Sequence, residues 1–184
     1  MTVRANKPAF SIREKLKELD YAHVPYDKIA PGAVVQTVFH FAPDSPAGAE
    51  NETTSTSYTD ANITKFNFTP KFRNSKIILV WYIQTKTTDS DSSYQYVRAR
   101  KTINGVESDA GTGENAQLFF QGTIGAGNHI SYGPVSAAIV DTPNTLSTIE
   151  YKLQQKVTGD AQTVRIGENG QNSELLCVAT EIRQ

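Results

Sequence analysis

Residues 75–86 read Ser-Lys-Ile-Ile-Leu-Val-Trp-Tyr-Ile-Gln-Thr-Lys, a run of β-branched, aromatic and aliphatic residues that is typical of a β-strand. Successive side chains of a strand point to opposite faces of its sheet. The odd-numbered positions from Ile77 to Ile83 therefore share one face, and the even-numbered positions from Ile78 to Tyr82 share the other. Both faces are apolar, so we expect a central strand that is buried on both sides.

Strand signals recur at short spacing on both sides of this stretch. Ile149, Tyr151 and Leu153 alternate with Glu150 and Lys152, which indicates a strand with one solvated face. Besides residues 75–86, we expect strands near residues 33–41, 61–69, 94–103, 116–121, 129–140, 147–157 and 174–182. Weaker candidates lie near residues 52–58, 106–109 and 162–166. Many short strands without intervening helices predict an all-β fold, an antiparallel β-sandwich or jelly-roll-like domain.

Turn and loop signals separate the expected strands. Asn104-Gly105 is the strongest hairpin signal, because a type I′ turn requires a positive φ at both central positions. Further turns are predicted at residues 141–144 and 167–170. Polar or glycine-rich composition predicts loops at residues 43–57, 85–93 and 122–128. Loops on a rigid β scaffold are common places for binding, and also for insertions without function.

Residues 1–30 differ from the rest of the chain. Ser11 and Glu14 match a capping box, in which each side chain satisfies a backbone donor at the start of a helix. Ile12, Leu16 and Leu19 follow as one apolar stripe, which predicts an amphipathic helix over about residues 11–20. Such a short helix is marginal alone in water, so it must pack on its own domain or on a neighbouring subunit. We expect residues 1–30 to be a docking arm and residues 31–184 to be the β module.

Composition narrows the function classes. The 184 residues carry 18 basic and 19 acidic side chains, a formal net charge of -1, so nothing predicts a nucleic-acid partner. The apolar run at residues 77–83 is far too short to span a membrane, and residues 1–8 lack the apolar stretch of a signal peptide. Cys177 is the only cysteine, which excludes an intrachain disulfide and a zinc cluster built from thiolates.

The sequence offers little catalytic chemistry. His23, His40 and His129 are the only histidines, and none lies in a motif that pairs it with a nucleophile or a second metal ligand. We therefore expect no enzyme activity, no metal and no cofactor. One row of side chains invites binding: Tyr94, Tyr96, Arg98 and Arg100 share a strand face. Such a row can stack on a sugar or contact a partner protein, and it can equally be a solvated face with cross-strand charge pairs.

Six short segments between residues 31 and 184 carry a resemblance to a known class. They are Pro31-Gly32-Ala33-Val34-Val35-Gln36, Ser57-Tyr58-Thr59-Asp60, Phe68-Thr69-Pro70-Lys71, Ser75-Lys76-Ile77-Ile78-Leu79-Val80, Ile149-Glu150-Tyr151-Lys152-Leu153-Gln154 and Ala179-Thr180-Glu181-Ile182. The series resembles the small β modules of bacteriophage virion appendages, in tail-fibre proteins and related structural proteins, especially of marine phages. The resemblance implies non-enzymatic virion structure, often as a homotrimer at the particle surface, sometimes with host-surface glycans as targets.

The length of chain ahead of the module refines this expectation. Fibre modules of this kind commonly follow a long shaft, whereas here only residues 1–30 precede the module. We expect a short fibre or knob that is made in the host cytoplasm and attached to other virion proteins through this arm. Two alternatives are a capsid decoration or cement protein that bridges capsomers, and a free carbohydrate-binding module. None of the three involves insertion into a membrane.

Overall fold

In the computed structural model the described part of the chain is built of antiparallel β-strands and their connections, and this part contains no helix. It comprises residues 29–42, 52–89, 93–111, 117–123, 129–158, 163–166 and 175–184. The strands are β1 (Val34–Ala42), β2 (Glu52–Thr53), β3 (Thr59–Phe68), β4 (Lys76–Asp89), β5 (Ser93–Ile103), β6 (Val106–Asp109), β7 (Gln117–Thr123), β8 (His129–Asp141), β9 (Ile149–Thr158), β10 (Thr163–Ile166) and β11 (Leu175–Ile182).

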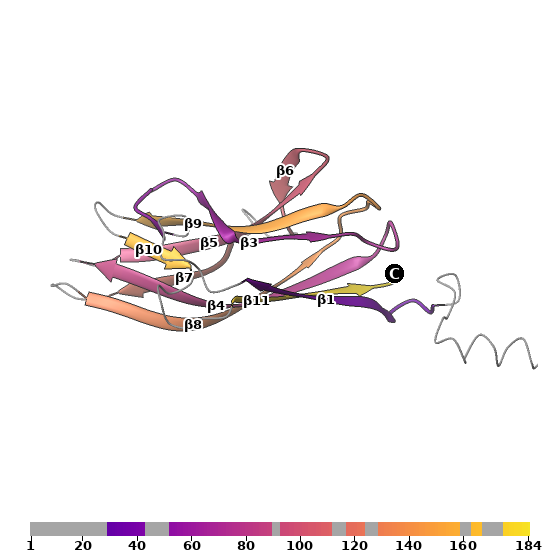
Figure 1. Cartoon of the computed structure of the whole chain (residues 1–184), viewed down its shortest axis with the longest axis horizontal. Helices are drawn as coiled ribbons and strands as arrows, with labels where there is room; N and C mark the ends of the chain where they lie inside the picture. The colour runs from indigo at the N-terminus through magenta and orange to yellow at the C-terminus, as the bar shows by residue number, and fades with distance from the viewer. Residues whose placement is uncertain are drawn as a thin grey trace, which may run out of the picture.

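The strands form two sheets that lie face to face (Figure 1). In the first sheet, β4 pairs with β8 along one edge, and along its other edge it pairs with both β11 and β10. Strand β1 pairs with the outer edge of β11, and β2 pairs with the outer edge of β10. In the second sheet, β9 lies between β3 and β5, and the far edge of β5 carries β7 and β6. The predicted all-β antiparallel class with two packed sheets is confirmed. The predicted helix over residues 11–20 lies outside the described residues.

The main pairings are nested in the sequence. Val34 pairs with Ile182 in the β1–β11 pair, and Ala61 pairs with Leu153 in the β3–β9 pair. Within these, Ile77 pairs with Asp141 in the β4–β8 pair, and Ser93 pairs with Thr123 in the β5–β7 pair. The described strands between residues 34 and 182 thus pair in the manner of one long hairpin that is folded into two layers. This arrangement places the first and last strands side by side (Figure 1).

The core lies between the two sheets and uses the inward face of each strand. Trp81 and Leu79 of β4 and Tyr151 and Leu153 of β9 are completely buried. The Phe66 ring contacts the rings of Trp81 and Tyr151, at centroid distances of 6.5 and 5.7 Å. Burying a large apolar side chain contributes on the order of 1.5–3 kcal/mol, so these residues dominate the stability of the module.

His40 is a structural residue of this core. Its imidazole stacks on the Phe66 ring at a centroid distance of 5.5 Å. Desolvation by burial lowers the pKa of His40, and a hydrogen bond with the backbone of Ile63 opposes that effect. The imidazole is therefore held in its neutral form near neutral pH.

Turn chemistry follows the sequence where the residues are described. Asn104 and Gly105 have φ angles of 51° and 79°, as the predicted type I′ turn between β5 and β6 requires. Asn144 also has a positive φ, of 53°, in the predicted turn after β8. Residues 167–170 and 124–128 lie outside the described part of the chain.

The expected loop at residues 85–93 is wrong in its first half. Strand β4 continues to Asp89, and the side chains of Thr85 and Thr87 are completely buried. These residues continue the inward face of the strand beyond Ile83. Threonine is polar enough to suggest a loop, yet its β-branched shape fits the pleated surface of a strand.

Strand β4 is central, as predicted, but it is not buried on both sides. Its inward residues are buried, whereas on the outer face Ile78 and Val80 are half-buried and Tyr82 is 50% exposed. The two sheets cover each other on one side only, and nothing in the described part of the chain lies over the outer face of the first sheet. The outer face of β4 is thus as apolar as a buried face, although no described residue packs over it.

The buried carboxylate of Glu181 holds the segment that connects β3 to β4. Glu181 of β11 is completely buried, and its Oε1 accepts hydrogen bonds from the backbone N–H groups of Lys71 and Phe72, at 2.9 and 3.0 Å, and from the Ser75 hydroxyl, at 2.5 Å. Its Oε2 accepts a bond from Gln36 Nε2 at 2.7 Å. The C-terminal strand therefore holds the connection at residues 69–75 in place.

Candidate functional site

The outer face of the second sheet gathers most of the chemistry in the described residues. Strand pairing brings Asp60 of β3 beside Gln154 of β9, and Gln154 beside Arg98 of β5. The same register places Lys156 beside Tyr96 and Lys152 beside Arg100. Alternation explains the arrangement, because the intervening residues of β5 and β9 point into the core.

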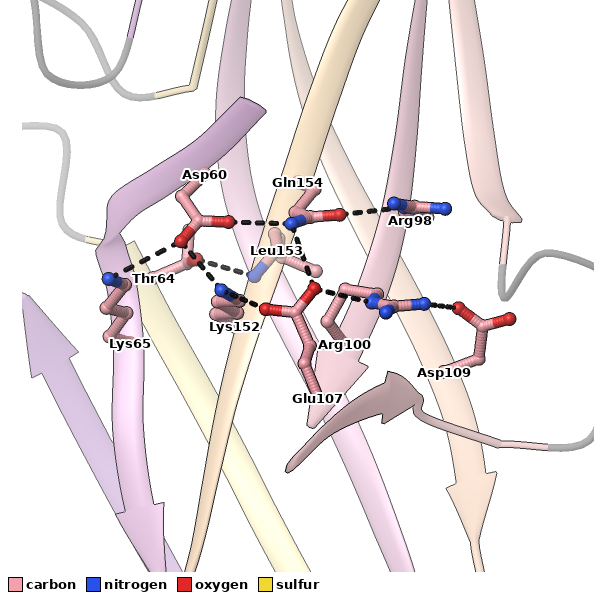
Figure 2. A network of polar contacts seen from close by, with 10 residues as sticks. All are labelled: Asp60, Thr64, Lys65, Arg98, Arg100, Glu107, Asp109, Lys152, Leu153 and Gln154. Atoms are coloured by element: carbon pink, nitrogen blue, oxygen red, sulfur yellow. Dashed lines mark hydrogen bonds and ion pairs between the residues drawn. The ribbon is translucent and has the colours of Figure 1, made fainter. Parts of the chain in front are cut away.

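One half of this face is a network of paired charges (Figure 2). The Nζ atom of Lys152 lies 2.7 Å from Asp60 Oδ2 and 2.6 Å from Glu107 Oε2, and the Lys152 side chain is only 7% exposed. Lys65 contributes a longer contact to Asp60, at 3.5 Å. A nearly buried ammonium needs such partners, since an unpaired buried charge is strongly destabilising.

The β5–β6 hairpin completes the network. Its Glu107 accepts a bond from Arg100 Nε at 3.1 Å, and Asp109 pairs with the terminal nitrogen Nη1 of the same guanidinium. Glu107 thus joins Arg100 of β5 to Lys152 of β9 (Figure 2). These contacts tie the projecting hairpin to the sheet, and they neutralise both cations.

The pKa values of the network follow from these contacts. For Asp60, burial raises the pKa, but hydrogen bonds from Lys152 and Gln154 and the charges of two lysines lower it overall. The pKa of Glu107 is lowered, chiefly by its hydrogen bond with Lys152. Burial works against the charged form of Lys152, yet its bonds to the two carboxylates raise the pKa overall. All three groups are therefore charged across the neutral range.

The other half of the face is a Tyr–cation cluster, made of Tyr58, Tyr96, Arg98 and Lys156. The Arg98 guanidinium carbon lies 4.0 Å from the centre of the Tyr58 ring. The Lys156 ammonium lies 4.8 Å from the Tyr58 ring centre and 5.3 Å from that of Tyr96. Cations at these distances are attracted to the ring faces. Among the described residues, neither cation of the cluster forms an ion pair with a carboxylate.

The four residues predicted as a binding row fall into both halves of the face. Tyr94, Tyr96, Arg98 and Arg100 do share the outer face of β5. The structure places Arg100 in the charge network, where Glu107 and Asp109 neutralise it, and it places Tyr96 and Arg98 in the Tyr–cation cluster. Tyr94 lies beyond the cluster at 37% exposure. The docking-arm residues Ile12, Leu16 and Leu19 lie outside the described residues.

Sequence reasoning missed Tyr58 and Lys156 as parts of this face. It expected Lys152 on a solvated face, whereas the Lys152 side chain is nearly buried among its carboxylate partners. The alternation of β9, continued past Leu153, places Gln154 and Lys156 on the same side as Lys152 and could have identified them. Nothing in the sequence showed that β3 and β5 are the neighbours of β9. The cluster depends on that pairing.

A second surface stands out on the opposite side of the molecule. We define the open apolar face as the part of the outer face of the first sheet formed by Phe39, Phe41, Ile78, Val80, Tyr82, Ala138, Val140 and Val178. One row crosses four strands, from Phe39 to Val178, then to Val80 and Ala138. Phe39 and Phe41 are each 59% exposed, although their rings stack on each other at 6.5 Å. None of these eight residues carries a charge, and the charged residues on the same side of β4, Lys76 and Lys86, lie toward its two ends.

Other chemistry is sparse in the described residues. They hold no cluster of three or more histidine, cysteine or acidic side chains that could bind a metal ion. Burial raises the pKa of the Cys177 thiol, which therefore stays protonated near neutral pH. None of the described residues forms a helix with the length and apolar character needed to cross a membrane.

Comparison with other proteins gives no identification. No protein-family model matches the chain, and no curated protein is found to match it.

Proposed function

We propose that this chain is a non-enzymatic structural protein of a bacteriophage particle, a short fibre or knob that assembles as a homo-oligomer and docks through residues 1–30. The phage context comes from the resemblance of the short segments between residues 31 and 184. The assembly has independent physical support in the open apolar face. A second candidate of the same kind is a capsid decoration protein, which would use the same two surfaces.

We infer that the β module is a jelly roll. The eight long strands form two groups of four, in the orders β1-β11-β4-β8 and β3-β9-β5-β7, and their pairings are nested. Both features support a long hairpin that wraps into a sandwich, the arrangement found in viral capsid and lectin domains. The analogy concerns fold alone, because one fold hosts many functions.

The open apolar face is the observation that carries the proposed assembly. Strand β4 has the apolar pattern of a strand buried on both sides, yet Tyr82 and its neighbours are uncovered. Soluble monomers rarely expose a contiguous apolar surface without a function. A second copy of this chain is the best occupant, since an uncharged face can meet a like face without charge repulsion.

The mass of the purified full chain in solution tests this assembly. A double substitution, Phe39→Ser with Phe41→Ser, removes the most exposed rings of the face and should lower the mass to that of the 20.2 kDa monomer. The unsubstituted chain should have a multiple of that mass, two-fold if the face meets a like face and three-fold if the trimer expectation holds. The matched control is Val106→Ser with Leu146→Ser, because these residues are 70% and 51% exposed and lie outside the face.

Two outcomes would overturn the proposed assembly. One is a monomeric unsubstituted chain at all concentrations up to those reached in a virion. The other is an unchanged oligomer in the Phe39/Phe41 variant, confirmed as folded by circular dichroism.

Incorporation into particles tests the docking arm. A chain that lacks residues 1–28 keeps the backbone carbonyl of Ile29, which accepts a hydrogen bond from Arg183. We expect this truncated chain to fold and to be lost from particles assembled with it. Normal incorporation would show that residues 1–28 are not the docking element.

A further inference from the structure

We propose that the Tyr–cation cluster binds a carboxylate-bearing sugar, that is, an acidic polysaccharide. This inference deepens the proposed function, since it names the ligand class that a surface-exposed virion protein would contact through its second sheet. Binding is nevertheless a property of the isolated chain and can be tested without particles.

The charge balance of the face points to this cluster. Lys65, Arg100 and Lys152 each have a carboxylate within ion-pair distance. Arg98 and Lys156 have none among the described residues, and both lie against the same Tyr58 ring. Two like charges held close together repel each other, and a bound anion relieves that repulsion.

Arg98 is held in position for an anion. Its Nε donates a hydrogen bond to Gln154 Oε1 at 2.8 Å, and Gln154 in turn donates to Asp60 Oδ1 at 2.7 Å (Figure 2). The Tyr58 ring, whose centre lies 4.0 Å from the guanidinium carbon, provides a second contact. The terminal nitrogens of Arg98 have no partner among the described residues. A guanidinium fixed at Nε can offer its remaining donors to a carboxylate, which is the geometry that arginine recognises best.

The rings and the lysine fit a sugar better than a small inorganic ion. Tyr96 lies directly beside Lys156 across the β5–β9 pair, so an aromatic surface and an ammonium adjoin each other. Tyrosine combines an apolar ring with a polar hydroxyl, and a pyranose likewise combines an apolar C–H face with hydroxyl groups. Arg98 would bind the carboxylate, and Lys156 would add a second positive charge.

The surroundings disfavour a nucleic acid. Asp60, Glu107 and Asp109 lie on the same face as the cluster, close to Arg98 and Arg100. A phosphate backbone requires a continuous basic surface, whereas this face alternates in sign. Two unpaired cations beside carboxylates suit a ligand with well-separated single charges, as in a polyuronic acid.

Calorimetric titration with oligogalacturonate tests the proposal, with its methyl ester as a neutral probe of the same sugar. We expect binding of the acid and little binding of the ester. Arg98→Gln and Lys156→Gln should each weaken binding by about tenfold or more, the effect of losing one charge-assisted contact. Lys65→Gln is the matched control, because it removes the same charge from the same face outside the cluster.

Several results would overturn the proposal. They are no binding of the acid at millimolar concentration, equal binding of the ester, and equal weakening by Lys65→Gln. Tighter binding of a sulfated oligosaccharide or of single-stranded DNA would also do so, since it would indicate a different anion. The absence of sugar binding would not alter the mass of the oligomer in solution. The binding proposal can therefore fail while the proposed assembly stands, and the reverse is also true.

Discussion

At the scale of single residues, identical side chains in the core have opposite roles. Thr64 and Thr87 are both completely buried. The Thr64 hydroxyl donates to the Ala61 carbonyl and accepts from the Leu153 N–H, each at 2.7 Å, where the β3–β9 register shifts. The Thr87 hydroxyl has no hydrogen-bond partner in the described structure. A buried polar group stabilises only when its hydrogen bonds are made.

This contrast predicts opposite effects of the same substitution. Thr64→Val should lower the free energy of unfolding by about 2 kcal/mol or more, because it leaves two buried backbone groups without partners. Thr87→Val should be neutral or raise it by up to about 1 kcal/mol, because it removes an unpaired hydroxyl. Urea unfolding of the two variants checks both values, and each serves as the control for the other. Equal losses would contradict the assignment.

The residues of the second sheet show how far sequence reasoning reaches at this scale. The alternation of β5 placed Tyr96, Arg98 and Arg100 on one face, and the structure agrees. It could not show that Arg100 is neutralised while Arg98 is not. That difference depends on Glu107 and Asp109, which reach Arg100 only through the geometry of the hairpin.

At the scale of elements, most strands and the Asn104-Gly105 turn could be predicted because they are local properties. A period of two and a positive-φ turn are encoded within a few residues. The main error, the loop expected at residues 85–93, arose where polar composition conflicted with β-branched shape. The pairing of Thr85 and Thr87 with β8 and β10 outweighed their polarity.

The hydrogen bonds from the β3–β4 connection to Glu181 of β11 lead to a testable prediction. In Glu181→Gln, the amide nitrogen would face the donors that now bind the carboxylate, so we expect a loss of about 2–4 kcal/mol in the free energy of unfolding. We also expect faster hydrogen exchange at the backbone amides of Lys71 and Phe72, because both donate hydrogen bonds to Glu181.

Glu150→Gln is the control for this substitution, because Glu150 is a half-buried carboxylate of β9. It should change neither the unfolding free energy nor the two exchange rates appreciably. If exchange at Lys71 and Phe72 stays slow in Glu181→Gln, the connection is held by other contacts.

At the scale of the whole molecule, we expect the free energy of unfolding to fall in both acidic and alkaline solution. The folded-state pKa of His40 is lowered from its ordinary value of 6.5, so its contribution is present above pH 6.5 and is lost as the pH falls. The pKa of Cys177 is raised from 9.0, so its contribution is present below pH 9.0 and is lost as the pH rises. Stability should therefore be greatest between these two values.

Denaturant unfolding at a series of pH values checks this profile. In His40→Phe the decline below pH 6.5 should be shallower, because the half-buried imidazole no longer titrates. In Cys177→Ala the decline above pH 9.0 should be shallower for the corresponding reason. The lowered pKa values of Asp60 and Glu107 should add a further loss in more acidic solution, below the range of His40. Unchanged slopes in both variants would contradict these assignments.

The sequence by itself determined the strands, the hairpin turn and the apolar character of both faces of β4, since each depends on neighbouring residues. Only the tertiary structure decided which strands are neighbours. That pairing joins residues far apart in the chain, such as Arg98 with Gln154 and Phe39 with Val178. It leaves the outer face of β4 uncovered and separates the neutralised cations from the unpaired ones. Pairing of distant strands reflects the packing free energy of the whole sandwich, which no local window of sequence contains.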